Sequence, residues 1–409
     1  MEREDGAVAD RASEWRRRFG LRAAESGSGV ESGGESTLES AAAEEAPADR
    51  LERAREQMRR IVLEQFGGDK ALLESVSKIA LTGRDALKVL ETAEREPEPM
   101  EFSSLEAIVA FDGTRPSFLV KNGEVDLASS FSADSWKTLL ASKSEQLAAF
   151  TACVGRVEIG KKSVGTAFLV APNLAMTCRH VAQLIAFFFP DGIELKPDVW
   201  LDFGREHSGR ESWDRRAVRK VLFAGRTVIT EPVDHAKLDL ALLEIEESKL
   251  PAPSGRDRCL ALSPGIQEVE GGNIVIASGY PDDWREFVPS KLRNEYEAVL
   301  AKLLEGEKGS KRLAPGESAS MLPAKDGALV RTSAHDATTI NGNSGSPMAV
   351  LSGAGKLAAV GLHYGGEWLG KRTNWAHVLG ACMDAKVTGG TDLRSALDQT
   401  MGPGRATHA

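Results

Sequence analysis

The sequence predicts a mainly β fold, a sandwich or a barrel, with a small helical region in front of it. From Cys153 onward the chain consists mostly of short apolar runs separated by turn residues. Many short strands at such spacing are typical of all-β sandwiches and barrels, and they disfavour a parallel α/β sheet. Between Asp49 and about Glu94, apolar residues instead recur every three or four positions, which is the period of an α-helix.

Individual elements can be assigned from the apolar runs and the turn signals. Helices are expected over residues 133–150, 182–189 and 289–305 and after Thr391, and Asn122-Gly123 is a hairpin signal. Strands of the β region are expected over residues 155–159, 166–170, 174–177, 199–203, 218–224, 240–245, 274–278, 328–332, 348–351 and 358–363.

The composition divides the chain into five segments. Residues 1–47, rich in Gly, Ser, Ala and Glu, are predicted to be disordered because they bury too little apolar surface to offset the entropy of ordering. Residues 48–96 are a helical module, and 97–152 are a connecting segment with a short hairpin and a helix. Residues 153–385 are the β domain, and 386–409 are a C-terminal helix and tail. The helices of the module are expected over residues 51–66, 70–79 and 84–94.

The bulk composition excludes several function classes. The net charge of −9 and the pI near 5.5 disfavour a nucleic-acid binder, which normally carries a basic excess. No apolar run is long enough to span a membrane, and the most apolar one, residues 184–190, is too short. The N-terminus has no basic start followed by an apolar core, so no secretory signal is expected.

The four cysteines are Cys153, Cys178, Cys259 and Cys382, scattered without a close pair at metal-binding spacing. This favours a reduced, cytoplasmic setting with free thiols, and no metal or cofactor is expected. Cys178 is expected to be a buried packing residue, and redox control of a neighbouring histidine is the alternative.

The stretch Asn-Gly-Asn-Ser-Gly-Ser-Pro, residues 341–347, places Ser344 in a tight, glycine-rich loop. Glycines on both sides let the backbone turn sharply and let a ligand approach the main chain closely. A serine hydroxyl is a poor nucleophile by itself, so a catalytic role requires a base and an orienting acid elsewhere in the chain.

Candidates for both partners exist. The base candidate is His180, in a short loop after two strand-like runs, and the chain has only seven histidines. The acid candidate is Asp239, at the entrance of an apolar run. Burying a carboxylate there is costly unless a group hydrogen-bonds it, and an imidazole N–H is such a partner. Singly, His180 fits a surface histidine and Asp239 a solvated strand start, but together with Ser344 they favour a Ser-His-Asp site.

Three motifs carry these residues in the order His, Asp, Ser: GTAFLVAPNLAMTCRHVA, LDLALLEI and TTINGNSGSP. From about Val154 to about Leu379 the chain resembles the chymotrypsin-like (trypsin-fold) serine peptidases, which have this order. The resemblance implies a double six-stranded antiparallel β-barrel with its site in the cleft between the barrels. It also implies a serine endopeptidase that acts on protein or peptide substrates.

The mechanism that the resemblance implies is acyl transfer. Ser344 would attack the peptide carbonyl, His180 would take its proton and deliver it to the leaving amine, and Asp239 would fix the imidazole tautomer. The backbone N–H groups of Gly342 and Ser344 would form the oxyanion hole.

Within this family the sequence is most similar to the glutamyl endopeptidases and their bacterial relatives. They share a Thr-rich approach to the GNSGSP loop and a Gly-[Ile/Leu]-His-x-Gly-Gly strand, which is residues 361–366 here. The resemblance implies that His363 and Thr339 bind an acidic side chain, and hence cleavage after Glu, Gln or Asp. Tyr364 and Gly365 would also bind substrate. In the alternative, His363 only shapes a pocket wall while residues 363–366 hydrogen-bond the substrate backbone.

The sequence also departs from the secreted members. Asn343 stands where trypsin-type zymogens have an aspartate, and an amide cannot form their ion pair with a newly cut N-terminus. Activity is therefore expected without cleavage before Val154. Residues 1–150 match no named motif and are expected to regulate the domain or to bind a regulatory protein partner. Two alternatives stay open: a catalytically inactive binding module on the same fold, and an interaction scaffold.

Overall fold

The computed structural model describes most of the chain apart from its two ends and several internal segments. Nearly all of the predicted disordered segment 1–47 and the predicted helix 289–305 lie outside the described residues. The described residues are 16, 21, 46–65, 67–98, 101, 104–105, 115–128, 134–207, 212–230, 234–250, 259–265, 269, 271–282, 307–321, 331–339, 342–351, 355–367 and 373–401.

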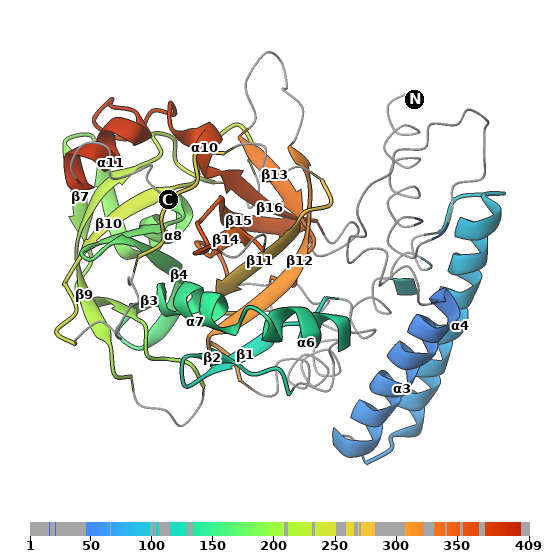
Figure 1. The fold of residues 1–409 in the computed structure, drawn as a ribbon. Helices are drawn as coiled ribbons and strands as arrows, with labels where there is room; N and C mark the ends of the chain where they lie inside the picture. Colours follow the sequence, from blue (N-terminus) through green and yellow to red (C-terminus); the bar gives the residue numbers. More distant parts are fainter. Residues whose placement is uncertain are drawn as a thin grey trace.

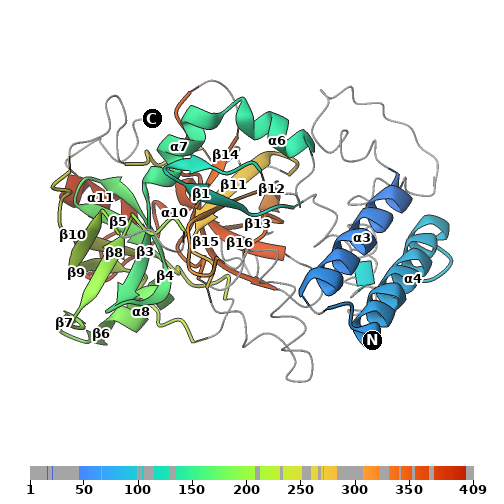
Figure 2. The ribbon, with the colours of Figure 1, turned by 90° about the horizontal axis from the view of Figure 1, so that it is seen from below.

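Two long helices, α3 (Pro47–Gln65) and α4 (Lys70–Thr92), pack side by side and stand at one side of the remaining structure (Figures 1 and 2). The prediction of a break between residues 79 and 84 was wrong, because α4 is continuous. Its apolar residues Val76, Ala80 and Leu87 are all buried, so burial of one apolar face keeps Gly83 helical. Within the described residues, no helix combines the length and the apolar character needed to cross a bilayer.

The first barrel is closed by six antiparallel strands in the order β10-β5-β4-β3-β8-β9. The predicted helix over 182–189 is only half right: α8 (Arg179–Ile185) gives way to a hairpin of β6 (Ala186–Phe189) and β7 (Gly192–Leu195). The barrel strands are β3 (Val154–Ile159), β4 (Lys162–Ala171), β5 (Leu174–Thr177), β8 (Val199–Asp202), β9 (Arg215–Ala224) and β10 (Ala241–Ile245).

The second barrel has the order β11-β14-β15-β16-β13-β12 and is closed by pairing of β12 with β11, which confirms the predicted double six-stranded fold. The sequence did not predict β12, because Pro315 and Gly316 within it are turn residues, nor did it predict β16. The strands are β11 (Ile274–Gly279), β12 (Arg312–Met321), β13 (Thr332–His335), β14 (Pro347–Val350), β15 (Gly361–Glu367) and β16 (Thr373–Val378).

The segment that precedes the barrels in sequence adds two strands to the sheet of the second barrel. The hairpin of β1 (Phe118–Lys121) and β2 (Glu124–Val125) turns at Asn122-Gly123, both with positive φ, as predicted. Strand β1 pairs with β12 and so lengthens the sheet of the second barrel. The predicted helix over 133–150 is two helices, α6 (Asp134–Ala141) and α7 (Ser144–Ala152). At the other end of the chain lie α10 (Leu379–Cys382) and α11 (Leu393–Met401).

The two barrels are joined at Thr166 of β4, a fully buried residue. Its N–H donates to Ser344 O at 2.9 Å, and its hydroxyl donates to Gly342 O at 2.8 Å while accepting from the N–H of Tyr280 at 3.1 Å. Its carbonyl accepts from Thr177 Oγ1 at 2.6 Å. One residue of the first barrel therefore holds two segments of the second.

Lys311 makes a second junction. Its ammonium is buried and donates to Thr151 O of α7 and Phe203 O after β8, both at 3.0 Å. Val120 of β1 in turn donates its N–H to Lys311 O at 2.9 Å. Burial lowers the pKa of Lys311 to about 8. This lysine thus ties both barrels to the segment that precedes them.

We predict that Thr166→Val lowers the free energy of unfolding by roughly 2–4 kcal/mol, because Gly342 O and the Tyr280 N–H lose their buried partner. Thr166→Ser, which keeps the hydroxyl, is the matched control. Urea unfolding would measure both, and an equal loss in the two variants would contradict a role for the hydroxyl.

A pH dependence is expected from Lys311. Because burial places its pKa at about 8 rather than 10.5, the unfolded chain binds the proton more tightly in that window, and stability rises with pH there. Relative to that of Lys311→Met, the free energy of unfolding of the wild-type protein should rise by about 3 kcal/mol between pH 8 and pH 10.5. Parallel pH profiles of unfolding for the two proteins would rule out this assignment.

Candidate active site

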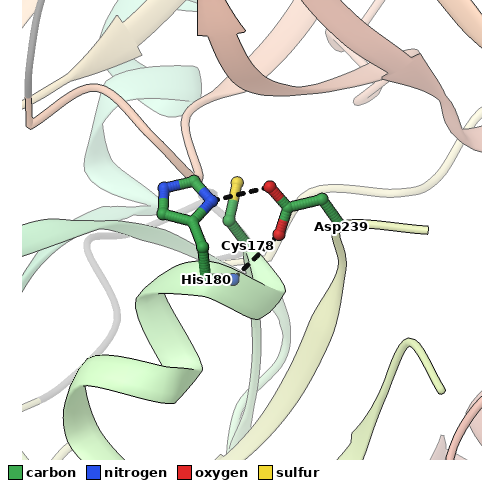
Figure 3. A group of neighbouring side chains, drawn as sticks. All are labelled: Cys178, His180 and Asp239. Carbon is green, nitrogen blue, oxygen red and sulfur yellow. Dashed lines mark hydrogen bonds and ion pairs between the residues drawn. The ribbon is translucent and has the colours of Figure 1, made fainter. Parts of the chain in front are cut away.

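His180 and Asp239 are brought together by the pairing of β5 with β10. Ala241 lies opposite Thr177, so the residues just outside the paired ends meet at one edge of the first barrel. The His180 N–H donates to Asp239 Oδ1 at 2.8 Å, and His180 Nδ1 lies 2.6 Å from Asp239 Oδ2. Figure 3 shows the imidazole turned toward the carboxylate from the first turn of α8. Asp239 is buried, whereas the His180 side chain is 29% exposed.

This geometry selects a tautomer of His180. An ionised carboxylate only accepts hydrogen bonds, so the short contact to Asp239 places the ring proton on Nδ1 and leaves Nε2 as an acceptor. Asp239 is itself held through its backbone, because its N–H donates to Nε2 of the buried His377 at 2.9 Å. Burial lowers the pKa of His377 to about 4, so this histidine is a neutral acceptor near neutral pH.

Cys178 lies beside this pair, and one ligand atom each from Cys178, His180 and Asp239 fall within 4.8 Å of one another (Figure 3). The cluster does not fit a metal centre. The Cys178 thiol donates to His363 O at 3.2 Å, and burial raises its pKa well above the usual value, so the thiolate that a metal needs is disfavoured. All four cysteines are free, and Cys178 is the buried packing residue predicted from the sequence.

Ser344 precedes β14 of the second barrel, and its carbonyl lies against Thr166 of the first barrel. Gly342 and Gly345 on either side of it have φ of +92° and +95°, and a Cβ at Gly345 would collide with Thr166 O. The Gly345 N–H donates at 2.8 Å to His363 O, the same oxygen that accepts the Cys178 thiol. The Ser344 loop and the start of α8, which carries His180, are therefore both anchored to a single carbonyl oxygen. Asn343 is buried beside Gly279 of β11. A Cβ at Gly279 would crowd the Asn343 Oδ1 atom.

His363 and Thr339, which were predicted to bind an acidic side chain, are both buried. His363 Nδ1 lies 3.2 Å from His335 Nε2, with the two rings edge to face. Burial lowers the pKa of His335 to about 4 and that of His363 well below its usual value, so both are neutral. Within the described part of the chain, Thr339 Oγ1 and His335 Nδ1 are buried without a hydrogen-bond partner.

Tyr364 uses its side chain internally. Its hydroxyl lies 2.6 Å from His235 Nδ1 and 3.0 Å from Thr332 Oγ1, and its ring stacks on His377 at 4.3 Å. Any contact of Tyr364 with substrate is therefore left to its backbone, as for the neighbouring Gly365.

Sequence reasoning missed three of the histidines that surround the site: His235, His335 and His377. A signal existed in their scarcity, since five of the seven histidines, His180 and His363 included, lie in α8, in strands of the second barrel or shortly before β10. Their roles depend on partners far away in the sequence, which periodicity and spacing do not reveal.

Comparison with known proteins adds independent support. The sequence model of the trypsin-like peptidase domain matches residues 165–360. A probable serine protease of Lysobacter enzymogenes is 29% identical over 302 residues, which cover 69% of this chain and 74% of that protein.

Two solved structures are also similar. A mutant of human heparin binding protein has 12% identity and a TM-score of 0.38, over 64% of this chain and 96% of that one. Mouse neuropsin, a serine protease, has 14% identity and a TM-score of 0.39, over 57% of this chain and 91% of that one. At such TM-scores, the assignment rests on the strand order and the family match.

The matched range runs from the first barrel into the second and contains His180, Asp239 and Ser344. Residues 165–360 therefore match a trypsin-like peptidase domain, and the chain is a serine endopeptidase.

Proposed function

We propose that this endopeptidase cleaves protein substrates through an acyl-enzyme on Ser344, with His180 as general base and Asp239 as its orienting acid. The observation that carries the proposal is the His180–Asp239 contact at 2.6 Å, which commits Nδ1 and leaves Nε2 to take a proton. The loop that carries Ser344 is held by two backbone hydrogen bonds: Ser344 O accepts the Thr166 N–H, and the Gly345 N–H donates to His363 O.

In the first step, Ser344 Oγ attacks the substrate carbonyl as His180 Nε2 takes its proton, and the imidazolium then protonates the leaving amine. A water molecule then attacks the acyl-enzyme as His180 Nε2 takes its proton. The imidazolium returns a proton to Ser344 Oγ, which releases the acid product. The buried Asp239 carboxylate stabilises the imidazolium in both steps. The backbone N–H groups of Gly342 and Ser344 are the proposed donors to the oxyanion, each worth roughly 3–4 kcal/mol in the transition state.

Ser344→Ala should reduce kcat by about 10³-fold or more while leaving unfolding unchanged, because only the nucleophile is lost. The same variant should not react with a fluorophosphonate, whereas the wild-type protein should be labelled at Ser344. A wild-type protein that is folded but neither labelled nor active on a broad peptide library would favour the inactive binding module.

We further propose a preference for Glu, with Gln or Asp as alternatives, through His363 and Thr339. The His335–His363 contact supports this preference by its tautomers. If His335 Nε2–H donates to His363 Nδ1, then the His363 proton is on Nε2, and this N–H is available to a carboxylate or amide oxygen. His335 Nδ1 is then an acceptor, which is the less costly group to leave unpartnered.

The unpartnered hydroxyl of Thr339 is the second support, because a buried hydroxyl without a partner is stabilised when a polar ligand reaches it. It lies five residues before the proposed nucleophile. A substrate carboxylate or amide between Thr339 and His363 would satisfy both groups.

Thr339→Val should lower kcat/KM for a Glu substrate by about tenfold, the effect of one lost hydrogen bond to a charged group. Cleavage after an apolar residue should be unchanged or improved. A fluorogenic panel with Glu, Gln, Asp, Phe and Arg at the cleaved position measures both. A wild-type preference for Arg, Lys or a bulky apolar residue would refute the acidic pocket.

For the rest of the chain we propose that residues 1–150 recruit a protein partner or regulate the peptidase, in a cytoplasmic setting. The support is the long helical pair α3 and α4 beside the barrels and four free thiols. No nucleic-acid or membrane partner is proposed.

A further inference from the structure

Arg115 lies in front of the first barrel in sequence but contacts the second barrel beside the specificity pocket. Its guanidinium Nη2 is 2.7 Å from Asp336 Oδ2 and 3.5 Å from Glu317 Oε1. Its backbone carbonyl accepts the Thr338 hydroxyl at 2.7 Å. Arg115 therefore reaches β12 and both ends of residues 336–338, the segment that leads into Thr339.

This segment has little freedom. The Asp336 carboxylate accepts the Glu317 N–H at 2.7 Å, and Ala337 O accepts from Asn374 at 2.8 Å. Residues 336 and 337 pass so close to β12 that a Cβ at Gly316 would collide with Ala337. The position of Thr339 is thus set by contacts of the three residues before it.

The charges at this point need the arginine. The side chains of Asp336 and Glu317 are 14% and 6% exposed, and that of Arg115 is 12% exposed. Two poorly solvated carboxylates share one guanidinium, so its removal would leave them facing each other without a shared countercharge. Their repulsion would act directly on the segment that leads from the end of β13 to Thr339.

We propose that Arg115 is a positioning residue for substrate recognition: it holds residues 336–339 as one wall of the specificity pocket. The proposal rests on the proposed function for the identity of that pocket. It gives residues that precede the barrels in sequence a part in substrate recognition, since β1 begins shortly after Arg115 and pairs with β12. The peptidase would then carry its own brace within one chain.

The test is Arg115→Met in the full-length protein. We expect kcat/KM for peptide substrates to fall roughly 10–100-fold, mostly through KM, because a displaced pocket wall weakens binding. Labelling of Ser344 by a small fluorophosphonate, which does not fill the pocket, should stay close to the wild-type rate. Amide hydrogen exchange should increase over residues 336–339 and stay unchanged over β3 and β4.

Two rescue variants and a control separate positioning from simple destabilisation. Arg115→Lys keeps the charge and should retain most of the activity. Adding Asp336→Asn to Arg115→Met removes one of the two neighbouring carboxylates while a side-chain oxygen still accepts the Glu317 N–H, and should bring KM part of the way back to the wild-type value. Arg216→Met breaks a more deeply buried pair with Asp214 in the first barrel and should lower stability without a selective change in KM.

Three outcomes are decisive. Unchanged KM and unchanged exchange in folded Arg115→Met would overturn the proposal. Peptide cleavage and fluorophosphonate labelling that fall in the same proportion as the folded fraction would also overturn it. A third outcome combines faster exchange over residues 336–339 in Arg115→Met with a wild-type protein that is neither active nor labelled. It would support the positioning of these residues by Arg115 and refute the proposed function instead.

Discussion

The geometry of the site depends on the four hydrogen bonds of Thr166. The proposed nucleophile on one barrel and the proposed base on the other can act together only if the barrels keep a fixed separation, and errors near 1 Å are already costly in catalysis. Thr166 meets that constraint without any side chain of the site itself. Its backbone and hydroxyl hold Gly342 and Ser344, and its carbonyl holds Thr177, three residues before His180. The serine and the histidine are thus referenced to one residue.

The carbonyl of His363 provides a second common reference. It accepts the Gly345 N–H from the serine loop and the Cys178 thiol from the histidine loop. Strand β15, which carries the predicted substrate-binding histidine, therefore contacts both the segment with the proposed nucleophile and the segment with the proposed base. Around it the protein buries His335, His363 and His377 as neutral rings, which act as directional donors and acceptors without the cost of a buried charge.

The motifs made His180, Asp239 and Ser344 candidates for the site from the sequence alone, because each lies at a local transition between loop and regular structure. What could not be predicted depends on distant partners. Strand β12 contains Pro315 and Gly316, and it is a strand because β11 and β13 pair with it. The run of phenylalanines at 187–189 is too short to separate a helix from a strand by period. The partners of Thr166, Arg115 and His377 include residues more than a hundred positions away.

The pairing of β1 with β12 has a consequence for how the chain is made. Ser117 and Arg312, which hydrogen-bond at this edge, are 195 residues apart. At typical rates of synthesis, roughly 10–40 s separate the appearance of the two partners. Throughout this interval β1 can pair only with β2, and the whole first barrel emerges before β12 does. The second barrel must then close late and around a strand made early, so the order of folding runs against the order of synthesis at this one edge.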